Sequence, residues 1–184
     1  MRLARDTFWR GGYAATSLDD LSAGMAMNRP SIYAAFGDKR ALYLQAVTEY
    51  AESSRDWLAA ALARPRSLPE GLRAVYRHAR DFYVAGDAPR GCFLLGTAVT
   101  EANRDPEVRA VVENTMSAFT VSFAERFERA EREGELSPHA PDALAQIATA
   151  ALNTLAVRAR TGADVAVLDA LIDATVGVIC GRPD

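Results

Sequence analysis

Apolar residues recur along this chain with the spacing of amphipathic α-helices, and no stretch shows the period-two alternation of a β-strand. The clearest pattern covers residues 106–133, where apolar positions keep a period of about 3.6 residues. Glycine and proline divide the rest into further helical blocks. We therefore expect an all-α protein of about nine helices. They cover residues 1–10, a segment opened by Ser17, a segment around Pro30 ended by Gly37, and residues 39–63, 69–85, 92–103, 106–133, 140–161 and 164–180.

The last two predicted helices mix alanine with branched aliphatic residues, which gives smooth faces that let helices approach closely. Two interpretations remain open for these stripes. They form the core of the chain itself, or they form a four-helix interface between two copies, since two-fold dimers are the commonest assembly. The predicted interface residues are Leu144, Ile147, Ala151, Leu155, Leu168, Leu171, Thr175 and Val178.

Residues 17–36 contain two short helical patterns separated by a turn of about four residues. Ser17 and Asp20 have the spacing of a capping box. Pro30 lies in the first turn of the second helix, where its missing N–H costs nothing. Ile32 and Phe36 form the apolar face of that helix, and the polar or amphipathic residues beside them are Asn28, Arg29, Ser31 and Tyr33. This arrangement predicts a helix-turn-helix, in which the second helix enters the major groove of DNA.

The exposed side chains of the second helix have chemistry that suits a DNA groove. Arg29 offers paired hydrogen bonds to guanine or a contact to a phosphate, while Asn28 and Ser31 offer short polar contacts. Tyr33 offers a hydroxyl for a phosphate and a ring for a thymine methyl group. Taken singly, these residues also fit ordinary surface, capping or packing roles. The spacing of the whole set favours DNA binding.

Three further residues suit the DNA backbone. Thr16 and Ser17 stand where the first of the two helices begins, so free N–H groups lie beside them for a phosphate. Lys39, at the start of the next helix, suits the flanking backbone. Bulk charge does not indicate a nucleic-acid partner, because the formal net charge of the chain is −3. Any DNA contact must therefore come from local placement.

Composition excludes several classes of protein. The chain has 184 residues, of which 49% are hydrophobic and 24% charged, as in a soluble globular protein. No apolar run reaches the ~20 residues of a membrane span, and no signal peptide is present, so we expect a cytoplasmic protein. Cys92, Cys180, His78 and His139 form no metal-ligand spacing. With no phosphate loop, dinucleotide fingerprint or nucleophile elbow either, we expect no metal, no cofactor and no enzyme.

The stretch "FWRGGYAATSLDDLSAGMAMNRPSIYAAFGDKRALYLQAV", residues 8–47, resembles the DNA-binding domain of the TetR family of transcriptional repressors. The matching features are Phe8, Gly12, Tyr13, Thr16, Ser17, Leu21, Gly24, Ser31, Ile32, Tyr33, Phe36, Lys39 and Leu42.

The resemblance implies a homodimer that binds a near-palindromic operator and releases it when a small molecule binds the C-terminal domain. It divides the chain into a helix-turn-helix domain, 1–45, and a ligand-binding and dimerisation domain, 46–184. One departure is that Met1 falls almost on the first helix, where family members carry several more residues. Either the start is trimmed, or the protein lacks an arm that would add backbone or minor-groove contacts, in which case we expect weaker DNA binding than is typical. The DNA contacts that the resemblance implies are Thr16, Ser17, Asn28, Arg29, Pro30, Ser31, Tyr33 and Lys39.

A supply of aromatic residues on the middle helices favours an apolar or aromatic effector. The same residues are also compatible with an ordinary core, and Cys92 alternatively suggests a thiol sensor. A ligand that wedges against the 39–63 helix would tilt it and change the spacing of the two DNA-binding helices. The predicted pocket residues are Tyr76, Tyr83, Cys92, Phe93, Thr97, Met116, Phe119, Phe123 and Asn153.

Two other functions remain as alternatives to a ligand-responsive repressor. The first is a ligand-binding helical protein that has lost specific DNA binding, which the short N-terminus and the low positive charge favour. The second is an all-helical enzyme that uses carboxylates such as Glu101, although no paired acid and base accompany that residue.

Overall fold

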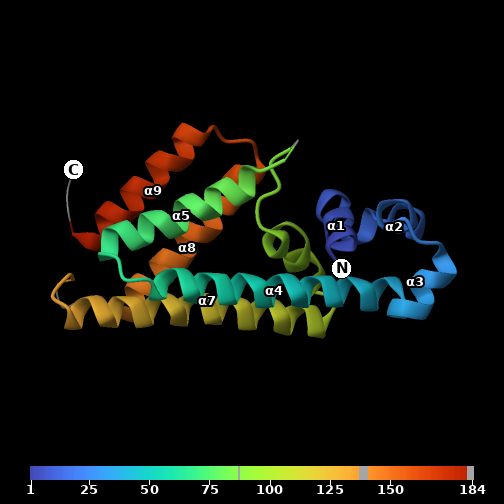
Figure 1. Cartoon of the computed structure of the whole chain (residues 1–184), viewed down its shortest axis with the longest axis horizontal. Coiled ribbons are helices and arrows are strands. Elements are labelled where there is room, and N and C mark those ends of the chain that lie inside the picture. Colours follow the sequence, from blue (N-terminus) through green and yellow to red (C-terminus); the bar gives the residue numbers. More distant parts are fainter. Residues whose placement is uncertain (87, 137–140, 182–184) are drawn as a thin grey trace. The chain divides into compact units, whose positions relative to one another are not determined.

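The computed structural model describes residues 1–86, 88–136 and 141–181, and every regular element in these ranges is helical (Figure 1). This confirms the predicted all-α class. The elements are α1 (Arg2–Ala15), α2 (Leu18–Met25), α3 (Arg29–Phe36), α4 (Lys39–Ala63), α5 (Leu68–Val84), the π-helix η1 (Leu94–Ala98), α6 (Val99–Ala102), α7 (Pro106–Arg132), α8 (Pro141–Arg160) and α9 (Val165–Cys180).

Most predicted boundaries lie within one or two residues of the observed ones, because capping residues mark them. Ser17 and Asp20 form both halves of a capping box, and Asp38 accepts a hydrogen bond from the backbone N–H of Ala41 at 2.7 Å. The first residue of the predicted helix 140–161 lies outside the described residues, and α8 begins at Pro141.

Two predicted helices differ from the structure. α1 continues past residue 10 to Ala15, and the expected break appears as a kink at Gly12, whose φ of 75° suits glycine. The predicted helix 92–103 is instead the π-helix η1 followed by the short α6. A π-helix inserts one extra residue per turn, and apolar periodicity does not reveal such an insertion.

The chain folds into two compact units. The first consists of residues 1–53 and 93–113, and the second of residues 54–92 together with the described part of 114–184. Helices α4 and α7 each contribute residues to both units. The units do not follow the division into 1–45 and 46–184, because segment 93–113 packs with the N-terminal helices. That division stays a prediction about domains.

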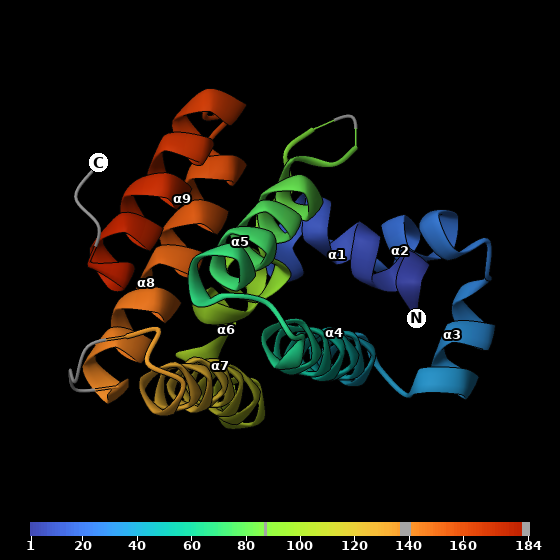
Figure 2. The same cartoon turned by 60° about the vertical axis from the view of Figure 1, so that its left-hand side comes forward.

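Helices α1, α2 and α3 belong to the first unit (Figure 2), and buried aromatic rings form the centre of that unit. Trp9 of α1 meets Tyr50 of α4 edge-on at 5.3 Å between ring centroids, and Phe93 lies 5.4 Å from Trp9 and 5.6 Å from Tyr50. Phe8 contacts Tyr43 at 5.0 Å. Such pairs add about 1 kcal/mol each beyond their buried area. The cluster therefore fixes α1 and the segment that begins at Phe93 on α4.

Polar bonds complete the packing of α4 within this unit. The hydroxyl of Tyr43 donates to Thr97 of η1 at 3.0 Å, and Thr97 in turn donates to the carbonyl of Phe93. One turn earlier, Arg40 makes paired hydrogen bonds to Asp105 at 2.6 and 2.9 Å and a third to Glu107 at 2.8 Å. The bonds from Arg40 lower the pKa of Asp105. The first turn of α4 is thus tied to the loop between α6 and α7.

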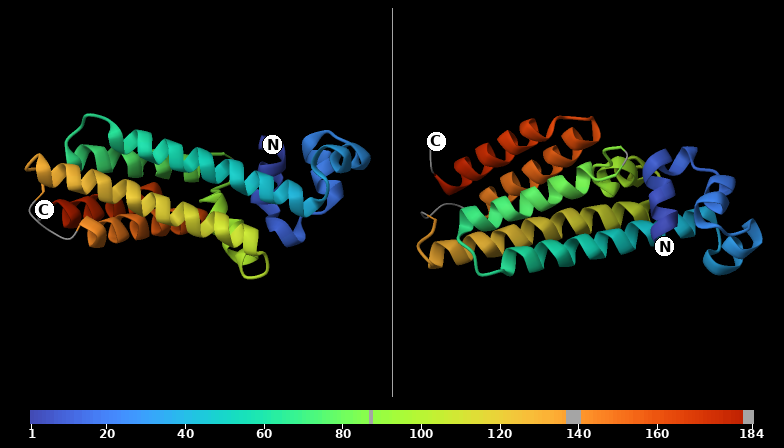
Figure 3. Two further views of the ribbon diagram at one scale, coloured as in Figure 1. Left: turned by 90° about the horizontal axis from the view of Figure 1, so that it is seen from below. Right: turned by 45° about the horizontal axis from the view of Figure 1, so that its top comes forward.

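In the second unit α5, α8 and α9 lie side by side (Figures 1 and 3). The buried hydroxyl of Tyr76 on α5 donates to the carbonyl of Ala148 on α8 at 2.9 Å. Arg73 pairs with Asp173 of α9 at 3.2 Å, and Arg80 pairs with Asp169 of the same helix. Apolar packing and these ion pairs hold the three helices together.

In the part of the chain that the structure describes, no helix is long and apolar enough to cross a membrane. The same residues include no group of three or more histidine, cysteine, aspartate or glutamate side chains that could hold a metal ion.

We predict that the Tyr43→Phe substitution has a pH-dependent cost. Burial raises the pKa of Tyr43 to about 12, whereas an unfolded tyrosine ionises near ~10. The unfolded state therefore loses its proton first as the pH rises from 10 to 12, and the free energy of unfolding falls over that window. The substitution should cost about 1 kcal/mol at pH 8, through loss of the bond to Thr97. It should cost close to nothing at pH 11. Urea unfolding at both values checks this, and an equal cost at each would contradict it.

Candidate nucleic-acid interface

Helix α2 begins at a complete capping box and lies close against α1. The hydroxyl of Ser17 accepts from the backbone N–H of Asp20 at 3.1 Å, and the backbone N–H of Ser17 donates to the carboxylate of Asp20 at 2.8 Å. The hydrogen bonds from Ser17 lower the pKa of Asp20. At Gly24 a Cβ atom would stand 2.4 Å from Oγ1 of Thr7. Any side chain at this position would therefore have to displace the Thr7 hydroxyl, which donates to the carbonyl of Leu3.

The turn between α2 and α3 is short and strongly capped. Ala26 ends α2 in the left-handed region, with φ 54°, and Asn28 begins α3 by accepting a hydrogen bond from the backbone N–H of Ser31 at 2.8 Å. Pro30 follows within the first turn, as predicted. The side-chain oxygen of Asn28 is thus a helix cap in this structure.

Helix α3 packs against the protein with one face and exposes the opposite face to solvent. Ile32 is fully buried and Phe36 is half-buried, while Ser31 and Pro30 are exposed. Tyr33 is 49% exposed, which is unusual for a large aromatic residue on a two-turn helix. The sequence predicted this division of the helix into two faces.

Arg29, at the start of α3, is paired with Asp19 of α2. Its Nε donates to Oδ1 of Asp19 at 2.8 Å, and its Nη2 donates to Oδ2. These bonds raise the pKa of Arg29. The sequence pattern did not indicate Asp19 as part of the site. Its only signal was an opposite charge on the other side of the turn.

Lys39 joins the start of α4 to the end of α1. Its Nζ donates to the carbonyl of Thr16 at 2.8 Å and lies 4.5 Å from the centre of the Tyr13 ring. Thr16 itself is buried, and its hydroxyl donates to the carbonyl of Gly12 at 2.6 Å. The Thr16 hydroxyl is therefore engaged inside the protein rather than turned toward a phosphate. Tyr13, which the sequence analysis did not include in the site, holds the Lys39 ammonium through its ring.

The nine residues predicted for a ligand pocket are divided between the two units. Phe93 and Thr97 belong to the first unit, where Phe93 is buried among aromatic rings. The other seven lie in the second, where Tyr76, Tyr83, Cys92, Phe119 and Phe123 are buried. Asn153 donates to the sulfur of Met116 at 3.7 Å.

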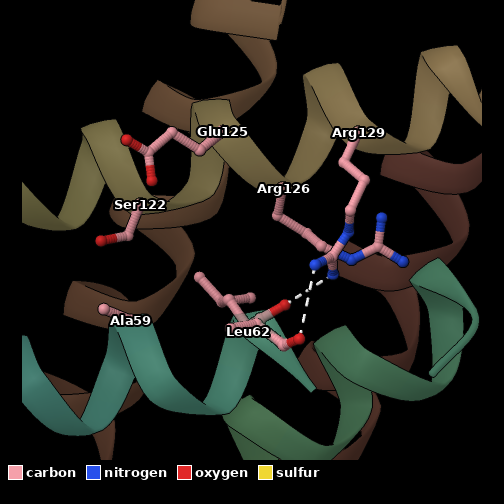
Figure 4. Close-up of a pocket in the computed structure, with 7 residues that line it drawn as sticks. Ala59, Leu62, Ser122, Glu125, Arg126 and Arg129 are labelled. Atoms are coloured by element: carbon pink, nitrogen blue, oxygen red, sulfur yellow. Dashed lines mark hydrogen bonds between the residues drawn. The ribbon is translucent and has the colours of Figure 1, made fainter. Parts of the chain in front are cut away.

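None of those nine residues lines either of two hollows formed by described residues. One, of about 120 Å³, lies between the end of α4 and α7, where Arg129 donates to the carbonyls of Leu62 and Ala63 (Figure 4). The other is an open groove of about 550 Å³ along α4, and its lining includes Glu49 and Glu52 of α4 and Glu107 of α7.

The residues predicted for a dimer interface separate into three groups by exposure. Leu155 and Leu168 face the core of their own unit, which removes them from the surface open to a second copy. Ile147 and Val178 are exposed, and Val178 is 72% exposed. The remaining four, Leu144, Ala151, Leu171 and Thr175, are partly exposed.

A capped helix, a tight turn and a second helix with an exposed polar face define the helix-turn-helix class of proteins. Residues 1–46 match the family described as bacterial regulatory proteins, tetR family, and residues 69–175 match the family described as the tetracyclin repressor-like C-terminal domain. The chain belongs to the TetR family of transcriptional regulators.

Individual relatives agree with this assignment. An uncharacterized HTH-type transcriptional regulator of Bacillus subtilis, YezE, is 28% identical over 96% of this chain and 92% of its own. The HTH-type transcriptional repressor ComR of Escherichia coli is 26% identical over 87% of this chain and 77% of its own. A solved structure of the TetR family regulator CifR with operator DNA is 27% identical, covers 95% of this chain and 92% of that one, and has a TM-score of 0.83.

We predict that Gly24→Ala destabilises the protein by about 2 kcal/mol, because the new methyl group overlaps the Thr7 hydroxyl. In a Thr7→Ala background the overlapping atom is absent, so the same change should cost much less. Urea unfolding of the two single variants and the double variant measures the coupling. Additive effects of the two substitutions would show that this approach does not constrain α2.

Proposed function

We propose that this regulator is a repressor that binds a near-palindromic operator as a homodimer and is released by a small-molecule effector. The observation that carries the proposal is the exposed face of α3, where Arg29, Ser31 and Tyr33 stand free of the core that holds Ile32. A helix presented in this way suits the major groove. The structure of CifR in complex with operator DNA supports the same interpretation of the fold. The protein then acts in the cytoplasm, without catalysis.

We assign the contacts with the DNA backbone to the residues that flank α3. The start of α2 at Ser17 offers backbone N–H groups and the positive end of a helix. Lys39 has two N–H groups besides the one that binds the Thr16 carbonyl, and they suit a phosphate. We assign Thr16 an indirect role, because its carbonyl positions the Lys39 ammonium.

The dimer interface is assigned to the outer faces of α8 and α9. Ile147 and Val157 on α8 and Val167 and Val178 on α9 are large apolar residues that a single chain leaves exposed. Covering such surface with a second copy is favourable by about 25 cal/mol for each Å² removed from water. A two-fold dimer of this kind presents its two copies of α3 to successive major grooves, about 34–36 Å apart.

We assign the effector-binding site to the second unit. Tyr76, Phe119 and Phe123 supply aromatic surface there, and Asn153 supplies a polar group near Met116. Effector and operator then oppose each other through one coupling free energy, typically about 1–3 kcal/mol. An apolar or aromatic molecule fits this supply of side chains.

A second candidate is a ligand-binding protein that has lost its operator. One observation favours it, namely that the only charged residue of α3, Arg29, is paired with Asp19. Selection of bound duplexes from a random DNA pool separates the two functions. An enriched near-palindrome supports the repressor, and no enrichment by a folded dimer supports the second candidate.

We predict that Tyr33→Ala weakens binding to the selected operator roughly tenfold or more and leaves folding unchanged, since Tyr33 contributes little to the core. Phe82→Ala serves as the control, because Phe82 is a similarly exposed aromatic residue, at 43%, on α5. Fluorescence anisotropy with labelled operator measures both variants. Equal affinities for the two variants would show that α3 is not the DNA-binding helix.

We predict that Val178→Asp dissociates the dimer at micromolar concentration, because it places a charge in the apolar interface. The control is Val121→Asp on α7, where the native side chain is 55% exposed. Sedimentation velocity measures the masses. If Val121→Asp dissociates the dimer and Val178→Asp does not, the interface lies elsewhere.

A further inference from the structure

The geometry of the turn points to Asp19 as a specificity-determining residue. We infer that its carboxylate holds the Arg29 guanidinium with one edge free for a guanine. The same carboxylate disfavours contacts between Arg29 and the phosphates of non-specific DNA. This inference rests on the proposed DNA binding by α3 and names a residue that positions its recognition group.

The first observation is which donors the pair occupies. Asp19 accepts from Nε of Arg29 at one carboxylate oxygen, at 2.8 Å, and from Nη2 at the other. A guanidinium has five N–H donors in a rigid plane, so two are used and three remain. Within the described residues Nη1 has no hydrogen-bond partner. The unused edge therefore consists of both N–H groups of Nη1 and the second one of Nη2.

That free edge fits the two acceptors, O6 and N7, which guanine presents in the major groove. A lone arginine side chain must be ordered before it can make such a paired contact, and Asp19 supplies that order in advance. Both partners are accessible, with the side chains of Arg29 and Asp19 53% and 72% exposed. An ion pair this exposed contributes little to folding. Its removal therefore tests recognition rather than stability.

The second observation is the charge of α3. Arg29 is the only charged residue between positions 28 and 36, and its pairing with Asp19 makes this surface locally neutral. Non-specific DNA binding comes from cations that neutralise phosphates. A phosphate that approaches Arg29 meets the Asp19 carboxylate and is repelled by it. The uncharged edge of guanine meets no such repulsion, so the pair favours base recognition over backbone contact.

The experiment compares the full-length chain with Asp19→Asn. Binding is measured to the operator selected from random duplexes, to operators changed one base pair at a time, and to a scrambled duplex, at several salt concentrations. For Asp19→Asn the affinity for scrambled DNA should rise roughly fivefold, and its log–log salt slope should steepen by about 0.9. The preference for guanine at one position of each half-site, roughly tenfold in the native chain, should fall to near none.

Two further variants separate the causes. Arg29→Lys keeps the charge but loses the planar fork, so it should lose the same guanine preference as Asp19→Asn. Glu52→Gln removes one negative charge from α4 without touching the pair, and it should leave the preference intact. Circular dichroism checks that all four proteins fold alike.

The outcomes distinguish this inference from the function on which it rests. If the native chain selects an operator and Asp19→Asn keeps both the guanine preference and the salt slope, the role of Asp19 is overturned while DNA binding by α3 stands. If the native chain selects no sequence, the proposed function is overturned together with the inference.

Discussion

The shortness of α2 and α3 is the constraint on which the interface depends. Each has eight residues, and isolated helices of that length are not stable in water. Their order comes from side-chain caps at Ser17 and Asn28 and from the burial of Leu21 and Ile32. The caps determine where each helix begins, and the buried residues determine which face is left for a partner. Loss of either would remove the exposed face, even with Arg29, Ser31 and Tyr33 in place.

The first unit supplies the support that two short helices cannot supply for themselves. Phe8 and Trp9 bring α1 onto α4, and the close approach at Gly24 brings α2 onto α1. Segment 93–113, distant in sequence, completes this packing through Phe93 and Thr97. A segment outside the helix-turn-helix therefore helps to hold it in place. A movement of that segment can for this reason alter the position of the DNA-binding helices.

The sequence was informative where local chemistry decides the structure and uninformative where packing decides it. The cap at Ser17, the place of Pro30 and the two faces of α3 follow from residues within a few positions of one another, so they were predictable. Asn28 was predicted only as a DNA contact, and the structure shows its side chain capping α3. The pairing of Asp19 with Arg29 depends on the angle at the turn, which no local pattern specifies. On α8 and α9 apolar residues occupy more than one face. Periodicity could not show that Leu155 and Leu168 face inward while Val178 faces outward.

Only Gly37 and Asp38 connect α3 to α4. Backbone rotation across this link is confined to four torsion angles, φ and ψ of Gly37 and of Asp38. Gly37 has φ 85° and ψ −97°, a conformation that residues other than glycine avoid. A link this short cannot accommodate a movement of α4 without also moving α3. Arg40, two residues further on, is anchored by Asp105 and Glu107. These two carboxylates therefore hold the α4 end of the link, and the recognition helix α3 lies at its other end. A shift of Asp105 in the α6–α7 loop, or of Glu107 in the first turn of α7, would therefore displace the side chains that face DNA.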